Sequence, residues 1–394
     1  MANKVLTLNQ ISLKGLERLP RDRYEIASEF SSPDAILLRS HKLQPEDIAG
    51  SVLAIARAGA GVNNIPVAEC TRRGIPVFNS PGANANAVKE LVAAALLLGS
   101  RGIVEGIRYV DTLGDMQDKA ELNRVLEAHK KQFKGNELVG KTLGVVGLGA
   151  IGSMVAEMAL TMGMEVIGYD PALSVEAAWR LSSKVRKADN LAMLFARSDY
   201  VSLHLPVLDS TRGLVKAELL GAAKKGSCLL NFARQEIVDE EAVTGALDAG
   251  TLRRYIADFP SPALIGRNDV ILMPHIGAST DEAEENCAIM AAEQLRDFLE
   301  NGNVRNSVNF PALQLERVTG CRLSVSNENV PKILGSVLAI LADENINVID
   351  MLNKSREGIA YNLIDIDTRA GEAVLDKMRA LRGVINVRLI GDCA

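Results

Sequence analysis

The sequence predicts an α/β protein built on parallel sheets, followed by a smaller ferredoxin-like domain, and three observations support this fold class. Between residues 35 and 277, short continuous apolar runs alternate with helical patterns. Continuous apolar runs are typical of parallel strands that helices cover on both faces. A run of the form GxGxxG joins one of these strands to a helix near the middle of the chain. After residue 320 the pattern changes to strand, helix, strand, strand, helix, strand, which is the βαββαβ order.

The expected elements follow from these runs in order. A long helix over residues 280–302 begins with acidic residues and stops at a glycine. The charged stretch 115–134 is expected to be a solvated helix, although its residues His129, Lys130 and Lys131 could instead reach the substrate anion of a neighbouring subunit. In the α/β region, strands are expected at residues 35–40, 52–59, 75–81, 142–149, 164–170, 200–206, 227–233 and 269–277. In the C-terminal region, strands are expected at residues 323–327, 346–355, 358–368 and 384–391, and helices at 330–345 and 371–382.

The composition limits the kind of protein. At about 150 residues per domain, 394 residues suggest two to three domains. Its 44 basic and 49 acidic residues give a net charge of −5, which argues against a nucleic-acid partner. No apolar run reaches the roughly 18 to 20 residues that span a bilayer, and the N-terminus lacks a signal-peptide pattern. We expect a cytoplasmic protein with no membrane partner.

The cysteines and histidines exclude two further classes of site. The five cysteines are scattered without a CxxC pair, so we expect reduced thiols. No two of the four histidines have metal-ligand spacing, and we expect no metal site. Histidine-dependent chemistry must therefore use His41, His129, His204 or His275.

The glycine-rich segment predicts a dinucleotide site. Gly147 would make a tight turn after the strand, Gly149 would let the backbone approach a pyrophosphate, and Gly152 would allow close helix packing. The N-terminus of the following helix offers free N–H donors to phosphates. Asp170 ends the next strand, where a carboxylate accepts hydrogen bonds from a ribose diol and repels a 2′-phosphate. The sequence therefore favours NAD over NADP.

Two residues are candidates for the chemistry of hydride transfer. His275 follows the last strand of the α/β region, and histidine is suited to exchange a hydroxyl proton near neutral pH. Arg234 ends another apolar strand, and its guanidinium could hold a substrate carboxylate and activate the carbonyl. His204 lies inside a strand pattern and is expected to be a packed, hydrogen-bonded residue.

Several motifs in this order resemble the D-isomer-specific 2-hydroxyacid dehydrogenase family. They are GLGAIG with Asp170, LHLP, NFARQEIVDEEAV and PHIGAST, together with RAGAGVNNIPVAECTRRGIPVFNSPGANANAVKELV upstream and GNVRNSVNFP downstream. The resemblance implies a flavodoxin-like substrate-binding domain of residues 1–86 and 285–311, with a Rossmann-type NAD domain of residues 87–284 inserted in it. The C-terminal residues 320–394 resemble a regulatory ACT domain.

The resemblance also implies site residues and partners. Catalysis would fall to Arg234 and His275, and L-serine would be an effector bound by Asn327, Asn329 and Asn347. The alternative for the C-terminal domain is a purely structural role as an oligomerisation module. The implied cofactor contacts are Gly147, Gly149, Ala150, Ile151, Gly152, Asp170, Leu205, Pro206, Phe232, Ala233, Asp258, Gly277 and Ala278. The implied substrate contacts are Arg39, Arg57, Ala60, Gly61, Val62 and Asn84.

The implied activity is NAD-dependent oxidation of 3-phospho-D-glycerate, a small phosphorylated 2-hydroxy acid, by a homodimer or homotetramer. Another D-2-hydroxy acid as substrate and a non-catalytic NAD-sensing interaction protein are the alternatives. The sequence departs from the family at one catalytic position, because no glutamate lies between Asp258 and His275 to pair with the histidine. Three alternatives account for the missing glutamate. Asp258 could both contact the cofactor and pair with His275, another carboxylate could approach His275 in space, or His275 could act without a carboxylate partner. In the effector region, Asn327 stands where a histidine is usual and Lys332 where a glycine is usual.

Overall fold

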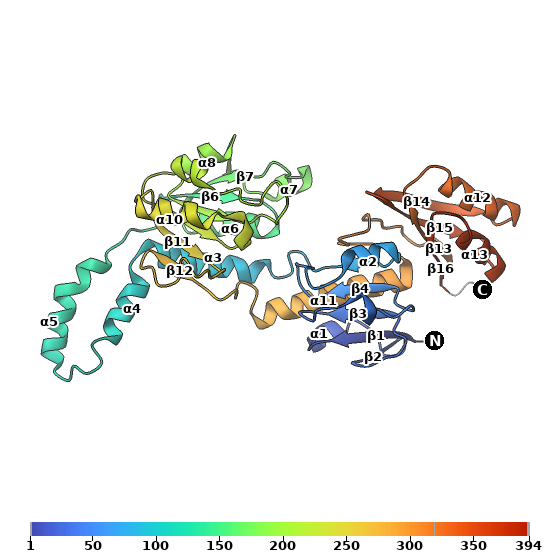
Figure 1. Ribbon diagram of the computed structural model, residues 1–394, viewed down its shortest axis with the longest axis horizontal. Helices are drawn as coiled ribbons and strands as arrows, with labels where there is room; N and C mark the ends of the chain where they lie inside the picture. Colours follow the sequence, from blue (N-terminus) through green and yellow to red (C-terminus); the bar gives the residue numbers. More distant parts are fainter. Residues whose placement is uncertain (1, 319, 392–394) are drawn as a thin grey trace. The chain divides into compact units, whose positions relative to one another are not determined.

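The computed structural model describes residues 2–318 and 320–391, and these fold into two compact units. The central unit is Ala85–Thr280, and the flanking unit consists of the described residues on both sides of it. The predicted α/β fold class is confirmed (Figure 1).

The central unit contains a seven-stranded parallel sheet of the doubly wound type. Its order is β12-β11-β10-β9-β6-β7-β8, so the order reverses at β6, which is where such sheets bind ligands. The strands are β6 (Thr142–Val146), β7 (Glu165–Tyr169), β8 (Arg186–Lys187), β9 (Tyr200–Leu203), β10 (Ser227–Asn231), β11 (Leu252–Ala257) and β12 (Val270–Leu272). The helices are α3 (Ala85–Ser100), α4 (Ile103–Asp111), α5 (Lys119–His129), α6 (Ala150–Thr161), α7 (Val175–Arg180), α8 (Leu191–Arg197), α9 (Ala217–Gly221) and α10 (Glu240–Asp248).

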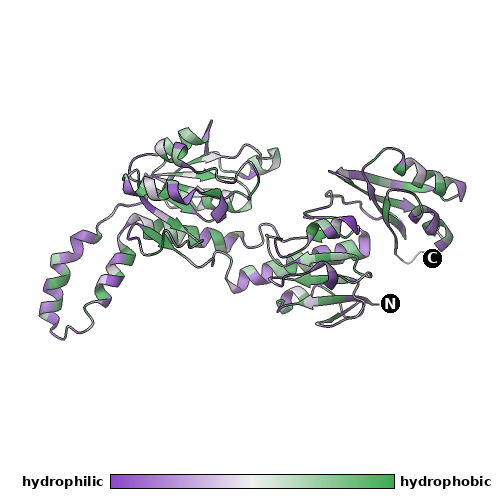
Figure 2. Ribbon diagram, in the orientation of Figure 1, coloured by the Kyte–Doolittle hydropathy of each residue, from purple (hydrophilic) through white to green (hydrophobic). Residues whose placement is uncertain are grey.

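Both faces of this sheet are buried, which explains the continuous apolar runs. Leu143 and Val145 point into one core with residues of α3 and α6, whereas Val146 points into another with residues of α8 and α10. Helices α4 and α5 differ, because they form an arm away from the sheet and contribute no buried residue (Figure 1). Both helices of the arm mix apolar and polar residues (Figure 2).

The flanking unit begins with a five-stranded parallel sheet in the flavodoxin-like order β2-β1-β3-β4-β5. The long helix α11 (Asp281–Asn301) returns to this sheet and packs against its core with Ala288, Ala291 and Leu295. The other elements are β1 (Asn3–Leu8), β2 (Tyr24–Ala27), β3 (Ala35–Leu38), β4 (Ala54–Arg57), β5 (Val77–Phe78), α1 (Leu13–Leu16) and α2 (Val67–Arg72).

The C-terminal part of the flanking unit is a four-stranded antiparallel sheet in the order β14-β15-β13-β16, as the βαββαβ pattern predicts. Helices α12 and α13 cover one face of this C-terminal sheet. The other face contributes Ile359, Tyr361 and Leu363 to the same core as α11. The elements are β13 (Cys321–Glu328), α12 (Ile333–Asp343), β14 (Val348–Arg356), β15 (Ile359–Ile366), α13 (Glu372–Arg379) and β16 (Val384–Ile390).

One expectation about the cysteines is wrong. Cys70, Cys228 and Cys287 are free and buried, as expected, but Cys321 is disulfide-bonded. Cys393 lies outside the described residues. Because the pattern of cysteine spacing contains no close pair, it did not indicate a disulfide at Cys321.

Candidate active site

The glycine loop after β6 has the geometry that a dinucleotide requires. Gly147 has a φ of +89°, and a Cβ there would lie 2.5 Å from the carbonyl oxygen of His204. A Cβ on Gly152 would lie 1.8 Å from the Gly147 carbonyl oxygen, so no other residue fits. At Gly149, by contrast, a Cβ would meet no atom within 4 Å. Gly149 is therefore not needed for packing within this chain, and the space beside it is open to a ligand.

The first turn of α6 faces the same loop with free donors. The backbone N–H groups of Ala150, Ile151 and Gly152 have no acceptor within the part of the chain that the structure describes. Asp170, which follows β7, accepts the N–H of Leu148 at 2.9 Å and that of Ala172 at 2.9 Å. Its carboxylate thus fixes the glycine loop and keeps further lone pairs for a ribose. These residues fit a bound NAD.

His275 lies on a turn that follows β12, and Asp258 holds this turn. The Asp258 carboxylate is 3% exposed and accepts the N–H of Ile276 at 2.8 Å and that of Gly277 at 2.7 Å. The backbone of His275 has a φ of +58°, a conformation that few non-glycine residues adopt. Such strain persists where the surroundings enforce it, and here the two hydrogen bonds to Asp258 do so.

The imidazole of His275 is exposed and packs on an aromatic ring. Its centroid lies 4.9 Å from that of Phe259, the residue after Asp258. No carboxylate hydrogen-bonds to this imidazole within residues 2–318 and 320–391. Asp258 therefore positions His275 through the backbone, not through the ring.

Arg234 is presented by a neighbouring turn after β10. The buried Asn231 accepts the N–H of Ala233 at 3.1 Å and donates to the Arg234 carbonyl at 2.9 Å. The guanidinium is exposed, with one Nη donating to the Ala233 carbonyl. The remaining Arg234 donors can accept a planar anion such as a carboxylate.

His204 is the packed residue that the sequence predicted. Its Nε2 forms a hydrogen bond with Ser202 Oγ, and the two atoms are 2.8 Å apart. Its Nδ1 is buried and has no hydrogen-bond partner among the described residues. Burial lowers the pKa of His204 to about 3, so its imidazole is neutral at physiological pH. We therefore assign His204 a structural role at the carboxyl end of β9, a central strand of the sheet.

The remaining predicted cofactor contacts lie at the same carboxyl edge of the sheet. Leu205 packs beside Gly147, and Pro206 follows it in the loop after β9. Phe232 and Ala233 are buried in the two cores of the unit, and Ala278 ends the His275 turn. All these loops follow the ends of β6, β7, β9, β10, β11 and β12.

The predicted substrate contacts lie in the flanking unit. Arg39 follows β3 and pairs with Glu284 of α11, with Nη1 2.6 Å from the carboxylate. Arg57 ends β4, and its guanidinium donates to the Arg39 carbonyl at 2.9 Å and to the Gly61 carbonyl at 2.5 Å. Arg57 thereby shapes the Ala60–Val62 loop, whereas Asn84 lies directly before α3.

The three predicted effector residues do not converge within one chain. Asn327 is 3% exposed, donates to the Glu328 carbonyl and accepts from Asn362, so its amide is already engaged. Asn329 follows the end of β13, whereas Asn347 precedes β14 at the opposite end of the sheet. Eight residues of strand separate these ends by roughly 26 Å. Lys332, which stands where a glycine is usual in the family, adopts a φ of +79°, a conformation that favours glycine.

Sequence reasoning missed Asn231, Phe259 and Glu284. Asn231 is adjacent in sequence to Phe232 and Phe259 to Asp258, and these positions beside predicted residues were the available signal. Glu284 gave no signal, since its partner Arg39 lies 245 residues earlier. No group of three or more His, Cys, Asp or Glu side chains among the described residues could hold a metal ion. None of the helices in that same part of the chain is long and apolar enough to cross a membrane.

The comparisons with known proteins agree with this fold. Residues 103–277 match the sequence model of the D-isomer specific 2-hydroxyacid dehydrogenase NAD binding domain. Over most of its length the chain is also 33% identical to a curated relative from Escherichia coli K12, covering 94% of this chain and 90% of that protein. The chain therefore belongs to the D-isomer specific 2-hydroxyacid dehydrogenase family.

Several of the curated relatives have the same name. The Escherichia coli protein is a D-3-phosphoglycerate dehydrogenase, and so is a Synechocystis relative that is 39% identical over 73% of this chain. The chain spans 51% of the Synechocystis protein and 61% of a Methanocaldococcus jannaschii relative of the same name. The solved NAD+-bound 3-phosphoglycerate dehydrogenase of Entamoeba histolytica is 28% identical with a TM-score of 0.61, covering 79% of this chain and all of that one.

Proposed function

We propose that this chain is an NAD-dependent dehydrogenase that oxidises 3-phospho-D-glycerate to 3-phosphohydroxypyruvate, the first step of L-serine biosynthesis. The main support for the proposal is the turn that Asp258 holds by two hydrogen bonds. This turn presents His275 at the carboxyl ends of the strands of the central sheet. The glycine loop follows β6 of the same sheet. The names of the relatives support the choice of substrate.

Each residue has a defined part in this reaction. A bound NAD would supply the acceptor for the hydride that leaves the carbinol carbon. His275 takes the hydroxyl proton as general base, for which its exposed ring is free to reach a substrate. Arg234 holds the carboxylate and stabilises negative charge on the reacting oxygen. Arg39 and Arg57 supply positive charge for the phosphate.

The proposed cofactor site uses the features of the central unit. Phosphates would lie at the N-terminus of α6 beside Gly149, and the ribose would bind Asp170. The other proposed contacts come from the loops after β9, β10 and β11 and from the His275 turn. We expect this NAD site to remain intact when His275 is replaced.

A direct assay separates this activity from the alternatives. The protein is mixed with NAD and 3-phosphoglycerate at alkaline pH, and NADH absorbance is followed for wild type and His275→Ala. We expect turnover in wild type and a loss on the order of 10² to 10⁴ in the variant, with NAD affinity unchanged. Equal use of lactate or glycerate would contradict a phosphorylated substrate. NAD binding without turnover would favour the sensing protein.

We also infer a homo-oligomer, in which the α4–α5 arm packs on a second copy of this chain. Ile107 is 59% and Val110 54% exposed on α4, and the arm contributes no buried residue by itself. Replacing both residues by aspartate should shift the sedimentation coefficient to that of a monomer. Sedimentation of wild type as a monomer would contradict the oligomer.

Two further proposals concern regulation and location. Feedback by L-serine at the C-terminal sheet would need two copies, since Asn329 and Asn347 lie at opposite ends of the sheet. Serine titration of wild type and Asn347→Ala tests this, and full wild-type activity at millimolar serine would leave only a structural role.

The cytoplasmic location stays a prediction from the sequence, to be checked by cell fractionation.

A further inference from the structure

The C-terminal end of α11 is capped by residues that come later in the chain. The last carbonyls of a helix have no partner within the helix. Here Leu299 O accepts from Arg388 at 3.1 Å, and Glu300 O accepts from Arg317 at 3.2 Å. The next two carbonyls, of Asn301 and Gly302, accept from Arg322 at 3.1 Å and from the Tyr361 hydroxyl at 2.7 Å. Three guanidinium groups thus face the negative end of the helix dipole, where positive charge is stabilising.

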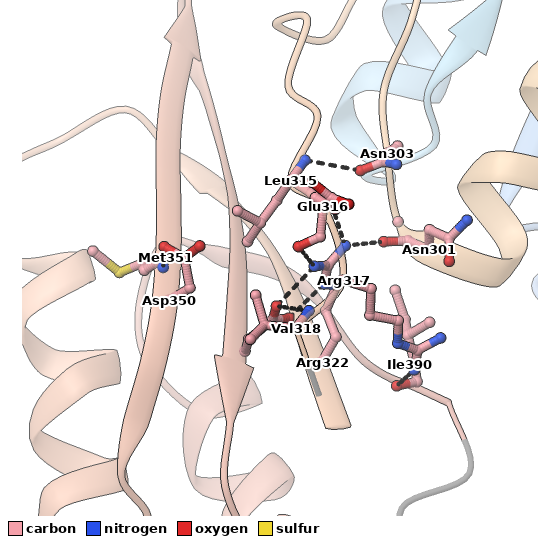
Figure 3. A network of polar contacts seen from close by, with 12 residues as sticks. Asn301, Asn303, Leu315, Glu316, Arg317, Val318, Arg322, Asp350, Met351 and Ile390 are labelled. Carbon is pink, nitrogen blue, oxygen red and sulfur yellow. Dashed lines mark hydrogen bonds and ion pairs between the residues drawn. The ribbon is translucent and has the colours of Figure 1, made fainter. Parts of the chain in front are cut away.

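Arg322 is the centre of this cap (Figure 3). Its side chain and that of Asp365 are both 0% exposed, and they form a bidentate ion pair at 2.5 and 2.8 Å. The remaining donors of Arg322 bind the carbonyls of Asn301, Leu315 and Glu316. All five donors of the guanidinium are therefore used, and the group joins β13 and β15 to α11 and to the connecting segment.

Apolar packing strengthens the same junction. The Arg388 guanidinium lies 4.8 Å from the ring centroid of Phe298 in the last turn of α11. Tyr361 packs edge-on against Phe310 with centroids 5.7 Å apart. A Cβ at Gly302, where φ is +73°, would lie 2.8 Å from side chains of the C-terminal sheet. The sheet and the end of α11 therefore form one packed core.

The rest of α11 holds the loops that carry the proposed phosphate residues. In its first turn Glu284 pairs with Arg39 after β3. In its second turn the Cys287 carbonyl lies 2.9 Å from Ser80 Oγ, and it shares the single proton of this hydroxyl with the Arg57 carbonyl at 3.1 Å. Further along, Gln294 donates to the Asn79 carbonyl at 2.9 Å. A single helix thus contacts the residues that follow or end β3, β4 and β5.

We propose that the C-terminal sheet positions the substrate-phosphate site through α11. The positioning residues are Tyr361, Arg388, Arg317 and Arg322. They fix the C-terminal end of α11, and the first turn of the same helix pairs with Arg39. When these contacts are weakened, the C-terminal end of α11 frays and the helix shifts. The affinity for the phosphorylated substrate then falls. The effect on substrate rests on the proposed function, whereas the mechanical coupling along α11 does not.

The test uses two mild substitutions that keep the packing. Tyr361→Phe removes only the hydroxyl that binds the Gly302 carbonyl, and Arg388→Met keeps a chain against Phe298 but removes the donor to the Leu299 carbonyl. Hydrogen–deuterium exchange of the full chain is measured at residues 298–305 and at 281–294. In the double variant we expect exchange at 298–305 to rise about tenfold, with a smaller rise at 281–294.

Kinetics complete the experiment. The KM for 3-phosphoglycerate should rise about 3- to 10-fold in the double variant, with the Kd for NAD unchanged. Arg379→Met is the matched control, because Arg379 pairs with Glu372 and Asp376 on its own helix and should alter neither measurement. Faster exchange at 298–305 with no change at 281–294 would overturn the coupling. If wild type does not oxidise 3-phosphoglycerate, the proposed function fails, and the exchange at 281–294 still decides the coupling.

Discussion

The buried carboxylate of Asp258 accepts the backbone N–H of Gly277 at 2.7 Å, and a Cβ at Gly277 would lie 2.9 Å from the same oxygen. This contact therefore depends on the carboxylate and on the lack of a side chain at Gly277. Because His275 lies two residues before Gly277, the contact also sets where the imidazole is presented.

Asp258→Asn should impair turnover more than folding. An amide offers one acceptor oxygen, and its NH2 group would face one of the two N–H groups that the carboxylate now binds. We expect kcat to fall on the order of 10- to 100-fold, since small displacements of a catalytic group are costly. Steady-state kinetics with thermal unfolding as a companion measurement check this. Wild-type kcat in Asp258→Asn would show that His275 is held by other contacts.

Gly149→Ala should block the cofactor without disturbing the fold. A Cβ at this position meets no protein atom within 4 Å, so stability should be unchanged. The methyl group would occupy the space through which the backbone approaches the pyrophosphate, and we expect the Kd for NAD to rise at least about tenfold. Gly245→Ala is the matched control, since a Cβ there also meets nothing and lies on α10. Equal NAD affinity in both variants would contradict the assignment of this loop.

Asp170→Ala should relax the preference for NAD over NADP. The substitution removes a ribose acceptor and the charge that repels a 2′-phosphate, while the bond to Leu148 is lost as well. We expect the ratio of kcat/KM for the two cofactors to change about 10- to 100-fold toward NADP. An unaltered ratio would mean that another group selects the cofactor.

His204 should make the protein less stable in mild acid. Burial lowers the pKa of His204 to about 3, below the ordinary value of 6.5, so between these values the unfolded chain binds a proton that the folded chain does not. Stability is then lost as pH falls below 6.5, by about 2 kcal/mol between pH 7 and pH 5. Urea unfolding of wild type and His204→Gln at both pH values measures this. A pH dependence of the same size in His204→Gln would contradict it.

The sequence predicts those elements that are marked by residues close together along the chain. The glycine loop, Asp170 and the long helix that stops before Gly302 are all indicated by residues close together in the sequence. Strand β11 was missed because Arg253 and Arg254 interrupt its apolar run, although Arg254 is paired with Glu105 in the structure. Strands β1, β2 and β8 were missed because they are short or carry alternating polar residues.

The site was less predictable than the fold because its supports are distant in sequence. The sequence indicates Asp258 as a cofactor contact, and in the structure its two carboxylate oxygens accept N–H groups 18 and 19 residues later in the chain. The pairing of Glu284 with Arg39 and the cap on α11 join residues that only the folded chain brings together. No periodicity or motif marks such contacts.

The ion pair of Arg322 and Asp365 gives the clearest prediction about stability. Both side chains are fully buried, so Arg322→Met leaves a carboxylate without its partner inside the protein. Removing one member of a buried pair typically costs about 3–5 kcal/mol, and we expect a loss of this size from urea unfolding followed by circular dichroism. Replacing both residues, as Arg322→Met with Asp365→Leu, should recover part of the loss because no charge is left unpaired. Recovery should be incomplete, since the carbonyls of Asn301, Leu315 and Glu316 still lose their donor. A double variant as unstable as the sum of the single variants would show that the two charges do not act as a pair.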